Sequence, residues 1–277
     1  MQIAAPAKIN LNLRVCGRNE ATGFHDLETW MVPLTLADEL RVELTNAPGI
    51  SLTCSDPELD NASGNLAWKA ADLFLREAKH PGGARLELHK HIPHGAGLGG
   101  GSSDAAAVLK ALNEQAAHPL TESTLTELAA QLGSDVPFFL RSKPAFARGR
   151  GEILEPRPAP QPLDLLLIKP PFAVETAWAY RQWDKNISVP SRWIAPQLDA
   201  GLEIFNDLER PVFAKYIILA ALKEWLLEHS LVAAAAMSGS GSCLFAILRD
   251  PRSAGQLAAE TKSEFGDTFW TAPCRTL

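Results

Sequence analysis

Cysteine is scarce in this 277-residue chain, and its spacing does not suit a metal site or a disulfide framework. No two cysteines form a C-x-x-C motif, and the histidines do not cluster at metal-ligand spacing. The four thiols are Cys16, Cys54, Cys243 and Cys274. Scattered thiols are typical of reduced structural cysteines, so a zinc site and a disulfide scaffold are not expected.

A secretion signal and a membrane span are also missing from the pattern. The opening MQIAAPAKIN has no apolar core before Lys8. The most apolar stretch, 213–237, is interrupted by Lys215, Lys223, Glu224, Glu228 and His229. This stretch predicts a buried or amphipathic helix rather than a span. We therefore expect a soluble cytoplasmic protein with no membrane partner.

Positive charge is not in excess. The chain has 26 Lys and Arg against 32 Asp and Glu, a net charge of −6, so no nucleic-acid partner is expected. An anionic small-molecule substrate would need a local positive pocket. The composition, 46% hydrophobic and 21% charged, is that of a globular chain long enough for one large or two modest cores.

Periodic segments predict a mixed α+β architecture. Residues 8–15 alternate, with Ile9 and Leu11 on one face and Lys8 and Asn10 on the other, as in a half-buried strand. Strands are predicted at 8–15, 39–45, 50–54, 84–90, 164–170 and 243–248. Helices are predicted at 65–79, 103–115 and 122–132, with helical segments within 205–230.

A proline-rich segment at 156–163, PRPAPQPL, has four prolines in eight residues and cannot lie inside a helix or sheet. It predicts a boundary between a domain at 1–155 and a domain at 163–277. Both halves mix strands and helices without an internal repeat. Two-layer α+β domains with a cleft between them are therefore expected.

Residues 93–106, PHGAGLGGGSSDAA, are the most informative segment. Glycine adopts positive φ and lets backbone N–H groups approach a ligand. Ser102 and Ser103 offer N-cap hydroxyls to the helix that follows, and a helix N-terminus attracts anions. We therefore predict a phosphate cradle made of Pro93, His94, Gly95, Ala96, Gly97, Leu98, Gly99, Gly100, Gly101, Ser102 and Ser103. The alternative is a flexible glycine turn capped by serine.

Two common nucleotide loops do not fit this segment. Gly95, Gly97 and Gly100 match G-x-G-x-x-G, but the dinucleotide fingerprint follows an apolar strand and precedes an acidic residue by about 20 positions. Here the preceding LELHKHIP is polar and alternating, and Glu122 is badly placed. A Walker A loop would end in G-K-[ST], and the segment has no lysine.

The pattern P-x-x-x-G-L-G-G-G-S-S-D-A-A resembles the central motif of the GHMP kinases, which include galactokinase and the homoserine and mevalonate kinases. Its extra glycines resemble the branch of 4-diphosphocytidyl-2-C-methyl-D-erythritol kinases, in the methylerythritol phosphate route to isoprenoids. The early PAKINLNLRVCGRNEATGFHDLETW and the late AAMSGSGSCLFAIL resemble the first and third motifs. NDLE at 206–209 and ARGRGEIL at 147–154 are also similar to this branch, so the resemblance covers most of the chain.

The resemblance implies a two-domain fold. The N-terminal domain would be like ribosomal protein S5 domain 2 and the C-terminal domain ferredoxin-like, with the active site in the cleft between them. It also implies ATP-dependent phosphorylation of the 2-hydroxyl of the cytidyl substrate by direct transfer. Mg²⁺ would arrive with ATP, bound mainly by phosphates. The protein is expected to be a monomer or weak homodimer.

Two residues are the expected catalytic pair. Asp135 in GSDVPFFL matches the family's GxDVPFF segment and would be the base, although it also suits the cap of a short helix beginning near Pro137. Lys8 would be its electrostatic partner and would assist the developing charge. The alternative for Lys8 is a surface lysine on an exposed strand face. Asn10 would position Lys8 or the substrate.

The cytidine end departs from the family pattern, which has GYH where this chain has GFH. By resemblance, Phe24 would stack on cytosine without the phenolic hydrogen bond, and His25 would recognise the base edge. Tyr180, which follows Thr176 in ETAWAY, would be the partner aromatic. The alternative is that Phe24 and Tyr180 are core residues.

The third motif would pack against the phosphate loop and line the substrate end of the cleft through Ser238 and Gly239. A plain glycine turn is the alternative.

Three further residues, Asn65, Leu66 and Lys90, match positions near the adenine in the family. Asp104 either complements the dipole at the start of its helix, which we favour, or holds Mg²⁺ with the hydroxyl of Ser102 or Ser103.

Two other functions stay open at this point. One is a sibling kinase for a small alcohol such as homoserine or mevalonate, against which GFH and the extra glycines argue. The other is a non-catalytic nucleotide-binding protein, against which the presence of Lys8 and Asp135 argues.

Overall fold

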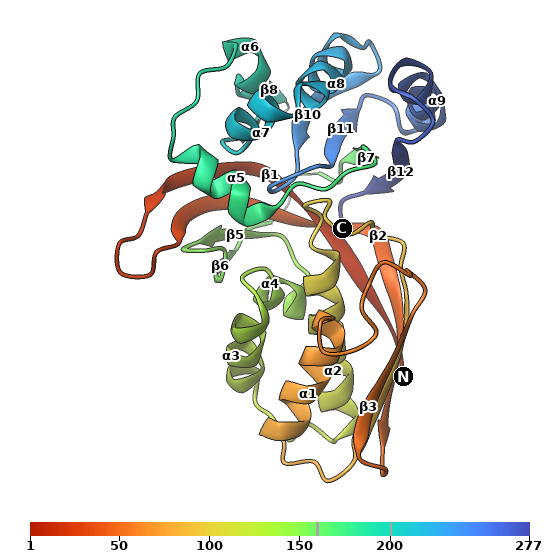
Figure 1. Ribbon diagram of the computed structural model, residues 1–277. Helices are drawn as coiled ribbons and strands as arrows, with labels where there is room; N and C mark the ends of the chain where they lie inside the picture. Colours follow the sequence, from red (N-terminus) through yellow and green to blue (C-terminus); the bar gives the residue numbers. More distant parts are fainter. Residues whose placement is uncertain (159–160, 200) are drawn as a thin grey trace. The chain divides into compact units, whose positions relative to one another are not determined.

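The computed structural model describes residues 1–158, 161–199 and 201–277 (Figure 1). By their contacts these residues form two compact units that alternate along the chain. The first unit contains 1–7, 36–93 and 99–143, and the second contains 8–35, 94–98 and 144–277. The boundary expected at 156–163 stays a prediction, and residues 159 and 160 of that segment lie outside the described residues.

Two long strands contribute to both units: β1 (Gln2–Arg18) and β2 (His25–Thr45). In the first unit, β4 (Gly83–His89) pairs antiparallel with the second half of β2, Glu39 opposite His89. β3 (Gly49–Cys54) pairs parallel with β4. The strands predicted at 39–45, 50–54 and 84–90 are confirmed.

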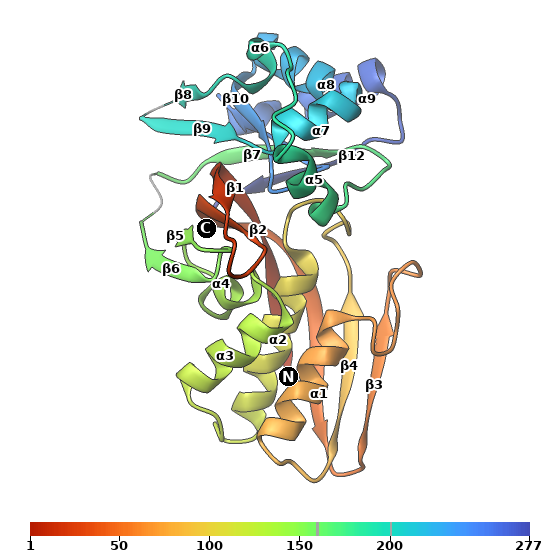
Figure 2. The same ribbon diagram turned by 60° about the vertical axis from the view of Figure 1, so that its left-hand side comes forward.

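Four helices complete the first unit: α1 (Leu66–Glu77), α2 (Gly100–Gln115), α3 (Glu122–Leu132) and α4 (Val136–Arg141). The other three helices pack against α2, and Figures 1 and 2 show α1, α2 and α3 as neighbours. Small buried residues permit this close packing, among them Ala67 and Ala71 of α1 and Ala105 of α2. The predicted helices at 65–79 and 122–132 are confirmed.

Helix α2 begins three residues earlier than the sequence pattern predicts. Its N-cap is Gly99, in the left-handed conformation with φ 74° and ψ 15°, and no side chain caps the helix. The prediction that Ser102 or Ser103 caps it is therefore wrong, because both serines lie inside the first turn. A positive φ at Gly99 turns the chain into the helix directly.

The second unit contains a four-stranded antiparallel sheet in the order β10 (Val232–Met237), β11 (Leu244–Leu248), β7 (Asp164–Lys169), β12 (Trp270–Arg275). Its helices are α5 (Thr176–Trp183), α6 (Ser191–Ile194), α7 (Glu209–Lys215), α8 (Ile217–Glu228), the short 3₁₀ helix η1 (Pro251–Ser253) and α9 (Ala254–Phe265). The strands predicted at 164–170 and 243–248 are confirmed.

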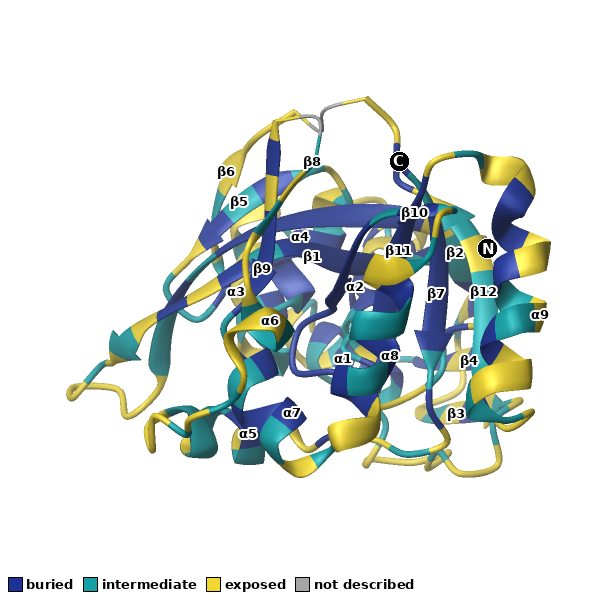
Figure 3. Ribbon diagram, turned by 90° about the horizontal axis from the view of Figure 1, so that it is seen from above, coloured by how far each residue is buried: buried dark blue, intermediate teal, exposed yellow. Residues whose placement is uncertain are grey.

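The apolar stretch 213–237 is not one helix. It contains the end of α7, all of α8 and then strand β10. Four consecutive alanines are strand rather than helix here because β10 is almost wholly buried, and Figure 3 shows β10 and β11 in dark blue along most of their length. Tertiary burial therefore overrides the helix propensity of alanine.

Shorter strands also belong to the second unit. β9 (Leu202–Asn206) pairs parallel with β1 and antiparallel with β8 (Gln197–Asp199). β5 (Ala145–Arg148) pairs with the first half of β2 and with β6 (Ile153–Pro156). The strand predicted at 8–15 is present within β1. The prediction that only one of its faces is buried is wrong at Lys8 and Asn10, whose polar side chains are buried too.

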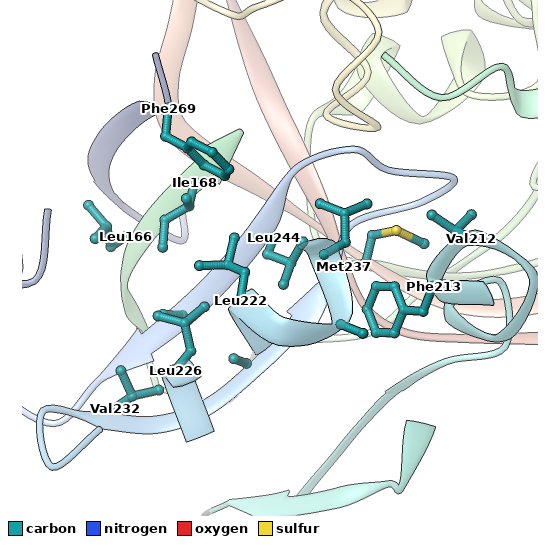
Figure 4. Packing of buried hydrophobic residues seen from close by; sticks show 14 of the residues in the cluster. Leu166, Ile168, Val212, Phe213, Leu222, Leu226, Val232, Met237, Leu244 and Phe269 are labelled. Carbon is teal, nitrogen blue, oxygen red and sulfur yellow. The ribbon is translucent and has the colours of Figure 1, made fainter. Parts of the chain in front are cut away.

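The core of the second unit lies between its sheet and α7 and α8. Leu222 and Leu226 of α8 belong to one buried cluster with Leu244 of β11 (Figure 4). Val212 and Phe213 of α7 extend this cluster beside Met237. Truncating such a leucine to alanine typically costs about 2–5 kcal/mol, so these residues hold α7 and α8 in place. None of the helices in the described residues is long and apolar enough to cross a membrane.

Candidate active site

The glycine-rich segment passes from the second unit to the first between Leu98 and Gly99. Gly95, Gly97 and Gly99 have φ values of 61°, 74° and 74°, so the prediction of positive φ is confirmed at these positions. Ala96 and Leu98 alternate with them and are buried. The segment is therefore held by its apolar side chains while the glycine backbone lies nearer the surface.

The third motif packs directly on this segment. Ser238 Oγ donates to the Gly97 carbonyl at 3.0 Å, and Cys243 N donates to the Ala96 carbonyl at 3.2 Å. A Cβ on Gly97 would overlap the carbonyl oxygen of Ser238, so glycine is required there. These contacts make the segment around Ser238 more than a plain glycine turn.

Asn206 holds the third motif from its other side. Its Nδ2 donates to the carbonyls of Met237 and Gly239, both at 2.7 Å, and the side chain is buried. Glu209 Oε1 accepts from Met237 N at 2.9 Å. Both residues come from the NDLE segment, which the resemblance singled out without giving it a role.

Lys8 is a buried residue beside this turn. Its backbone N donates to the Leu98 carbonyl at 2.9 Å, and its Nζ donates to Asn10 Oδ1 at 2.6 Å. Asn10 Nδ2 in turn donates to Thr29 Oγ1 at 2.7 Å. A Cβ on Gly239 would lie 3.4 Å from Lys8 Nζ. Lys8 is only 4% exposed, so the alternative of a surface lysine is wrong.

Thr29 is a site residue that the sequence analysis missed. It is 2% exposed and its hydroxyl links Asn10 to the backbone carbonyl of Asn12. Thr29 alternates with the apolar Leu27 and Met31 in LETWMV, which was the available signal, but a β-branched residue in a strand is common and does not by itself indicate a site.

Asp135 occupies the N-cap position of α4, yet its side chain makes no capping hydrogen bond. The short helix that the capping alternative predicted is therefore present with Asp135 at its N-cap position, but the Asp135 side chain does not cap it. Helix α4 packs on α2, and a Cβ on Gly133 would lie 4.0 Å from Ser102 Oγ in the first turn of α2. Within the first unit, the segment before Asp135 thus adjoins the start of α2. Lys8 belongs to the second unit, and its pairing with Asp135 stays a prediction.

His25, Tyr180 and two residues missed by the sequence analysis form an aromatic and acidic cluster. The His25 ring stacks on Tyr180 with centroids 5.3 Å apart and meets Trp183 edge-on at 5.9 Å. His25 Nε2 is hydrogen-bonded to Asp184 Oδ1 at 2.7 Å. Trp183 and Asp184 lie three and four residues after Tyr180, which is the helical spacing that could have identified them.

Helix α5 is tied to the third motif as well. Thr176 Oγ1, at its first position, lies 2.8 Å from Ser240 Oγ. Tyr180 packs against the core cluster while its ring meets His25. The second unit therefore brings together Thr176, Ser238, Gly239, Lys8 and Asn10, all of them residues expected at the substrate or catalytic positions.

Phe24 lies at the tip of the hairpin between β1 and β2 and is 55% exposed, so the core alternative is wrong for this residue. The Arg150 guanidinium lies 5.0 Å from its ring centroid, a cation–π contact. Gly23, with φ 74°, precedes it in the turn. An exposed aromatic ring backed by a cation is suited to stacking on a planar ligand.

The residues expected near the adenine have partners within the first unit. Asn65 Oδ1 accepts from Ala67 N at 2.9 Å and caps α1. The Leu66 side chain lies beside Gly101, 3.6 Å from where a Cβ would be. Lys90 Nζ is buried and bonded to Asp38 and, at 2.8 Å, to Asp104. Their contacts with ATP stay predictions, and His94 is an exposed residue for which we have no role.

Comparison with known proteins identifies the class of this chain. Residues 65–143 match the GHMP kinases N terminal domain, and residues 195–267 match the GHMP kinases C terminal domain. A homoserine kinase from Cytophaga hutchinsonii is 19% identical with a TM-score of 0.69, covering 100% of this chain and 94% of that one. At this identity the likeness shows the fold alone. Fold and motifs together define an α+β GHMP kinase.

More similar proteins specify the branch. A 4-diphosphocytidyl-2-C-methyl-D-erythritol kinase from Methylacidiphilum infernorum is 45% identical over 96% of this chain and 93% of its own. A crystal structure of 4-(cytidine 5'-diphospho)-2C-methyl-D-erythritol kinase is 37% identical, covers 99% of both chains and has a TM-score of 0.79. The chain belongs to the family of 4-diphosphocytidyl-2-C-methyl-D-erythritol kinases and is an ATP-dependent small-molecule kinase.

Proposed function

We propose that this chain transfers the γ-phosphoryl group of ATP to the 2-hydroxyl of 4-diphosphocytidyl-2-C-methyl-D-erythritol, in the methylerythritol phosphate pathway to isoprenoid precursors. The observation that carries the proposal is the 45% identity over 96% of the chain to a relative of that name. The homoserine kinase, at 19% identity, supports the fold but not its substrate.

The catalytic step needs a base and charge neutralisation, because phosphoryl transfer is largely a matter of positioning and electrostatics. In this proposal Asp135 takes the proton of the attacking hydroxyl, and no covalent enzyme intermediate forms. Lys8 stabilises the charge that develops. Two contacts support Lys8 in this role: its ammonium is fixed by Asn10 and lies beside the Gly239 turn.

The phosphates of ATP would bind the cradle from Pro93 to Ser103. Support comes from the start of α2, where Gly99 turns the chain into the helix and no side chain caps the first N–H groups. Backbone N–H groups at a helix N-terminus bind phosphate oxygens. Asn65, Leu66 and Lys90 would surround the adenine end, Leu66 by direct apolar contact.

The cytidine ring would stack on Phe24, with the edge of the base recognised by His25. The bond from Asp184 to His25 Nε2 fixes the orientation of the imidazole, which supports a recognition role. Tyr180 and Thr176 would complete this end of the site, and Ser238 and Gly239 would contact the substrate next to Lys8. Phenylalanine in place of the family's tyrosine keeps the stacking surface.

Mg²⁺ would reach the site with ATP, held mainly by phosphate oxygens, and would neutralise their charge. The fit of the protein side is limited: one Asp104 oxygen is already bonded to Lys90, and no group of three acidic, histidine or cysteine side chains in the described residues is placed to hold a metal ion. Ser103 Oγ is a buried hydroxyl without a hydrogen-bond partner there, so it fits best as an added protein ligand.

The test is ADP release from ATP and Mg²⁺ with 4-diphosphocytidyl-2-C-methyl-D-erythritol, beside homoserine and mevalonate. Turnover on the cytidyl compound alone is expected. Turnover on a small alcohol instead would favour the sibling-kinase alternative, and ATP binding without any turnover would favour the non-catalytic one.

The base is tested by Asp135→Asn, which should lower kcat by more than about 100-fold while ATP affinity changes little. Asp72→Asn is a matched control, because Asp72 is a surface residue of α1 paired with Arg76. Retained turnover in Asp135→Asn would contradict the assignment of the base. A cytoplasmic location and a monomeric or weakly dimeric state remain part of the proposal, and light scattering on the purified protein checks the latter.

A further inference from the structure

A buried charged cluster lies directly under the start of α2 in the first unit. Lys90 Nζ is bonded to Asp38 Oδ2 and to Asp104 Oδ2, the latter at 2.8 Å. The side chains are 6%, 0% and 2% exposed, respectively. We call these three residues the Lys90 cluster.

The Lys90 cluster joins the two ends of the phosphate loop. Asp38 Oδ1 accepts from the backbone N of His91 at 2.6 Å and of Ile92 at 2.8 Å, which fixes the chain where it leaves β4. Asp104 lies in the second turn of α2, which fixes the chain where the helix begins. Because Lys90 bonds both carboxylates, it links the chain just before the glycine-rich segment to the helix just after it.

The fit around this connection is tight. A Cβ on Gly100 would lie 3.0 Å from Ile92 Cγ2 and 3.3 Å from Lys90 Nζ. The first residue of α2 is thus packed against both the lysine and the residue that Asp38 holds. A shift of Lys90 would therefore move the first turn of α2, whose backbone N–H groups bind the phosphates of ATP in the proposed function.

The Lys90 cluster has more acidic than basic groups. A purely structural role does not require this imbalance. Two carboxylates share one ammonium, and Oδ1 of Asp104 has no hydrogen-bond partner among the described residues. A buried carboxylate in surplus costs folding free energy.

We propose that Asp104 is a positioning residue for ATP: through Lys90 and Asp38 it sets the distance between the two ends of the phosphate loop. The proposal rests on the ATP-binding role of this loop. It needs no contact between Asp104 and the nucleotide, and it explains why an aspartate follows the two serines of GGGSSDAA.

The test is Asp104→Asn, which keeps the size of the side chain and an oxygen for Lys90 but removes the charge. The charge-assisted bond to Lys90 then weakens and the start of α2 is held less firmly. We expect the Kd for ATP, measured by calorimetry without the alcohol substrate, to rise about tenfold. The KM for the cytidyl compound should change by less than about twofold, and the protein should be no less stable to urea. Asp72→Asn is the control and should leave all three unchanged.

Two results would overturn the proposal. One is an unchanged Kd for ATP in a folded Asp104→Asn protein. The other is loss of folding, because the surplus carboxylate would then be needed for the structure itself. Since ATP binding is measured without the cytidyl compound, failure of the proposed substrate would leave this result readable. Asp104→Glu should restore part of the affinity, because it restores the charge.

Discussion

The first unit buries Lys90 between two aspartates, whereas the second unit buries Lys223 against one glutamate. Lys223 Nζ is 2.5 Å from Glu209 Oε2, and both side chains are fully buried. The other glutamate oxygen accepts from Met237 N, next to the third motif. Each buried lysine therefore supports one glycine-rich segment.

The two clusters differ in the balance of their charges and in whether every buried polar atom has a hydrogen-bond partner. Both oxygens of Glu209 have partners and its charge is matched, whereas Asp104 leaves one oxygen without a partner among the described residues and shares Lys90 with Asp38. Burial raises the pKa of Glu209, but Lys223 and the Met237 amide oppose the rise. A balanced and satisfied pair is what a structural brace needs, so the unpartnered oxygen of Asp104 and its sharing of Lys90 with Asp38 indicate a second requirement.

The largest expected effect is on the balanced pair. Lys223→Met leaves Glu209 buried without its cation and should lower the free energy of unfolding by about 3–5 kcal/mol. Urea unfolding measures this loss. The double variant Lys223→Met with Glu209→Leu should recover most of it, because it removes both charges. No recovery would mean that the bond from Met237 N, rather than the ion pair, gives Glu209 its importance.

The next effect tests whether the NDLE segment, which contains Asn206 and Glu209, supports the turn at Ser238 and Gly239 beside Lys8. Asn206→Ala removes two hydrogen bonds to the third motif and should cost about 1–3 kcal/mol, with kcat lowered because the turn beside Lys8 loosens. Asn113→Ala is a matched control, since Asn113 is also buried and bonds the backbone of Leu120 twice. The control should lose similar stability but keep its kcat. Equal losses of kcat in both would contradict a specific role for Asn206.

A smaller effect on stability is expected at the unbalanced cluster. Asp104→Asn should leave the free energy of unfolding unchanged or raise it by up to about 1 kcal/mol, because it removes one buried charge. Urea unfolding of Asp104→Asn and of Lys223→Met under the same conditions would show that the two buried lysine clusters differ in their contribution to stability. A loss as large as that of Lys223→Met would remove the distinction between them.

The carboxylate of Glu260, whose side chain is 42% exposed, supplies the smallest effect and a reference for the buried carboxylates. Hydrogen bonds from Gln256 and His229 hold the pKa of Glu260 below its usual value. Its ionised form is therefore favoured in the folded state, so the stability it contributes is present above the usual carboxyl pKa and is lost as pH falls through the lower folded value. In a plot of Tm against pH, Glu260→Gln should slightly reduce the fall of Tm at acidic pH. A shift above pH 6 would contradict this cause.

Much of the local structure could be predicted from the chain. Helix α3 follows from a capping threonine and an amphipathic pattern, and β3 and β4 follow from alternation. The positive φ of Gly97 follows from residue type. Errors arose where long-range packing competes with local preference, as in the alanine-rich strand β10 and the start of α2 at Gly99.

The candidate site divides in the same way. The glycine-rich loop could be recognised from its residue types, whereas Lys8 and Asp135 could be named from the family motifs that their segments resemble, since a motif is a local property. Thr29, Trp183 and Asp184 could not, because their roles depend on which distant side chains they meet.

By itself, the amino-acid sequence determined the kinase family, the glycines of the phosphate loop and the residue types available for phosphoryl transfer. Only the tertiary structure decided that Lys8 is buried beside Gly239 and that Lys90 bonds two aspartates. The physical reason is that burial and charge pairing are properties of residues far apart in the chain. Asp38 and Asp104 are 66 positions apart, and folding brings both to the same lysine.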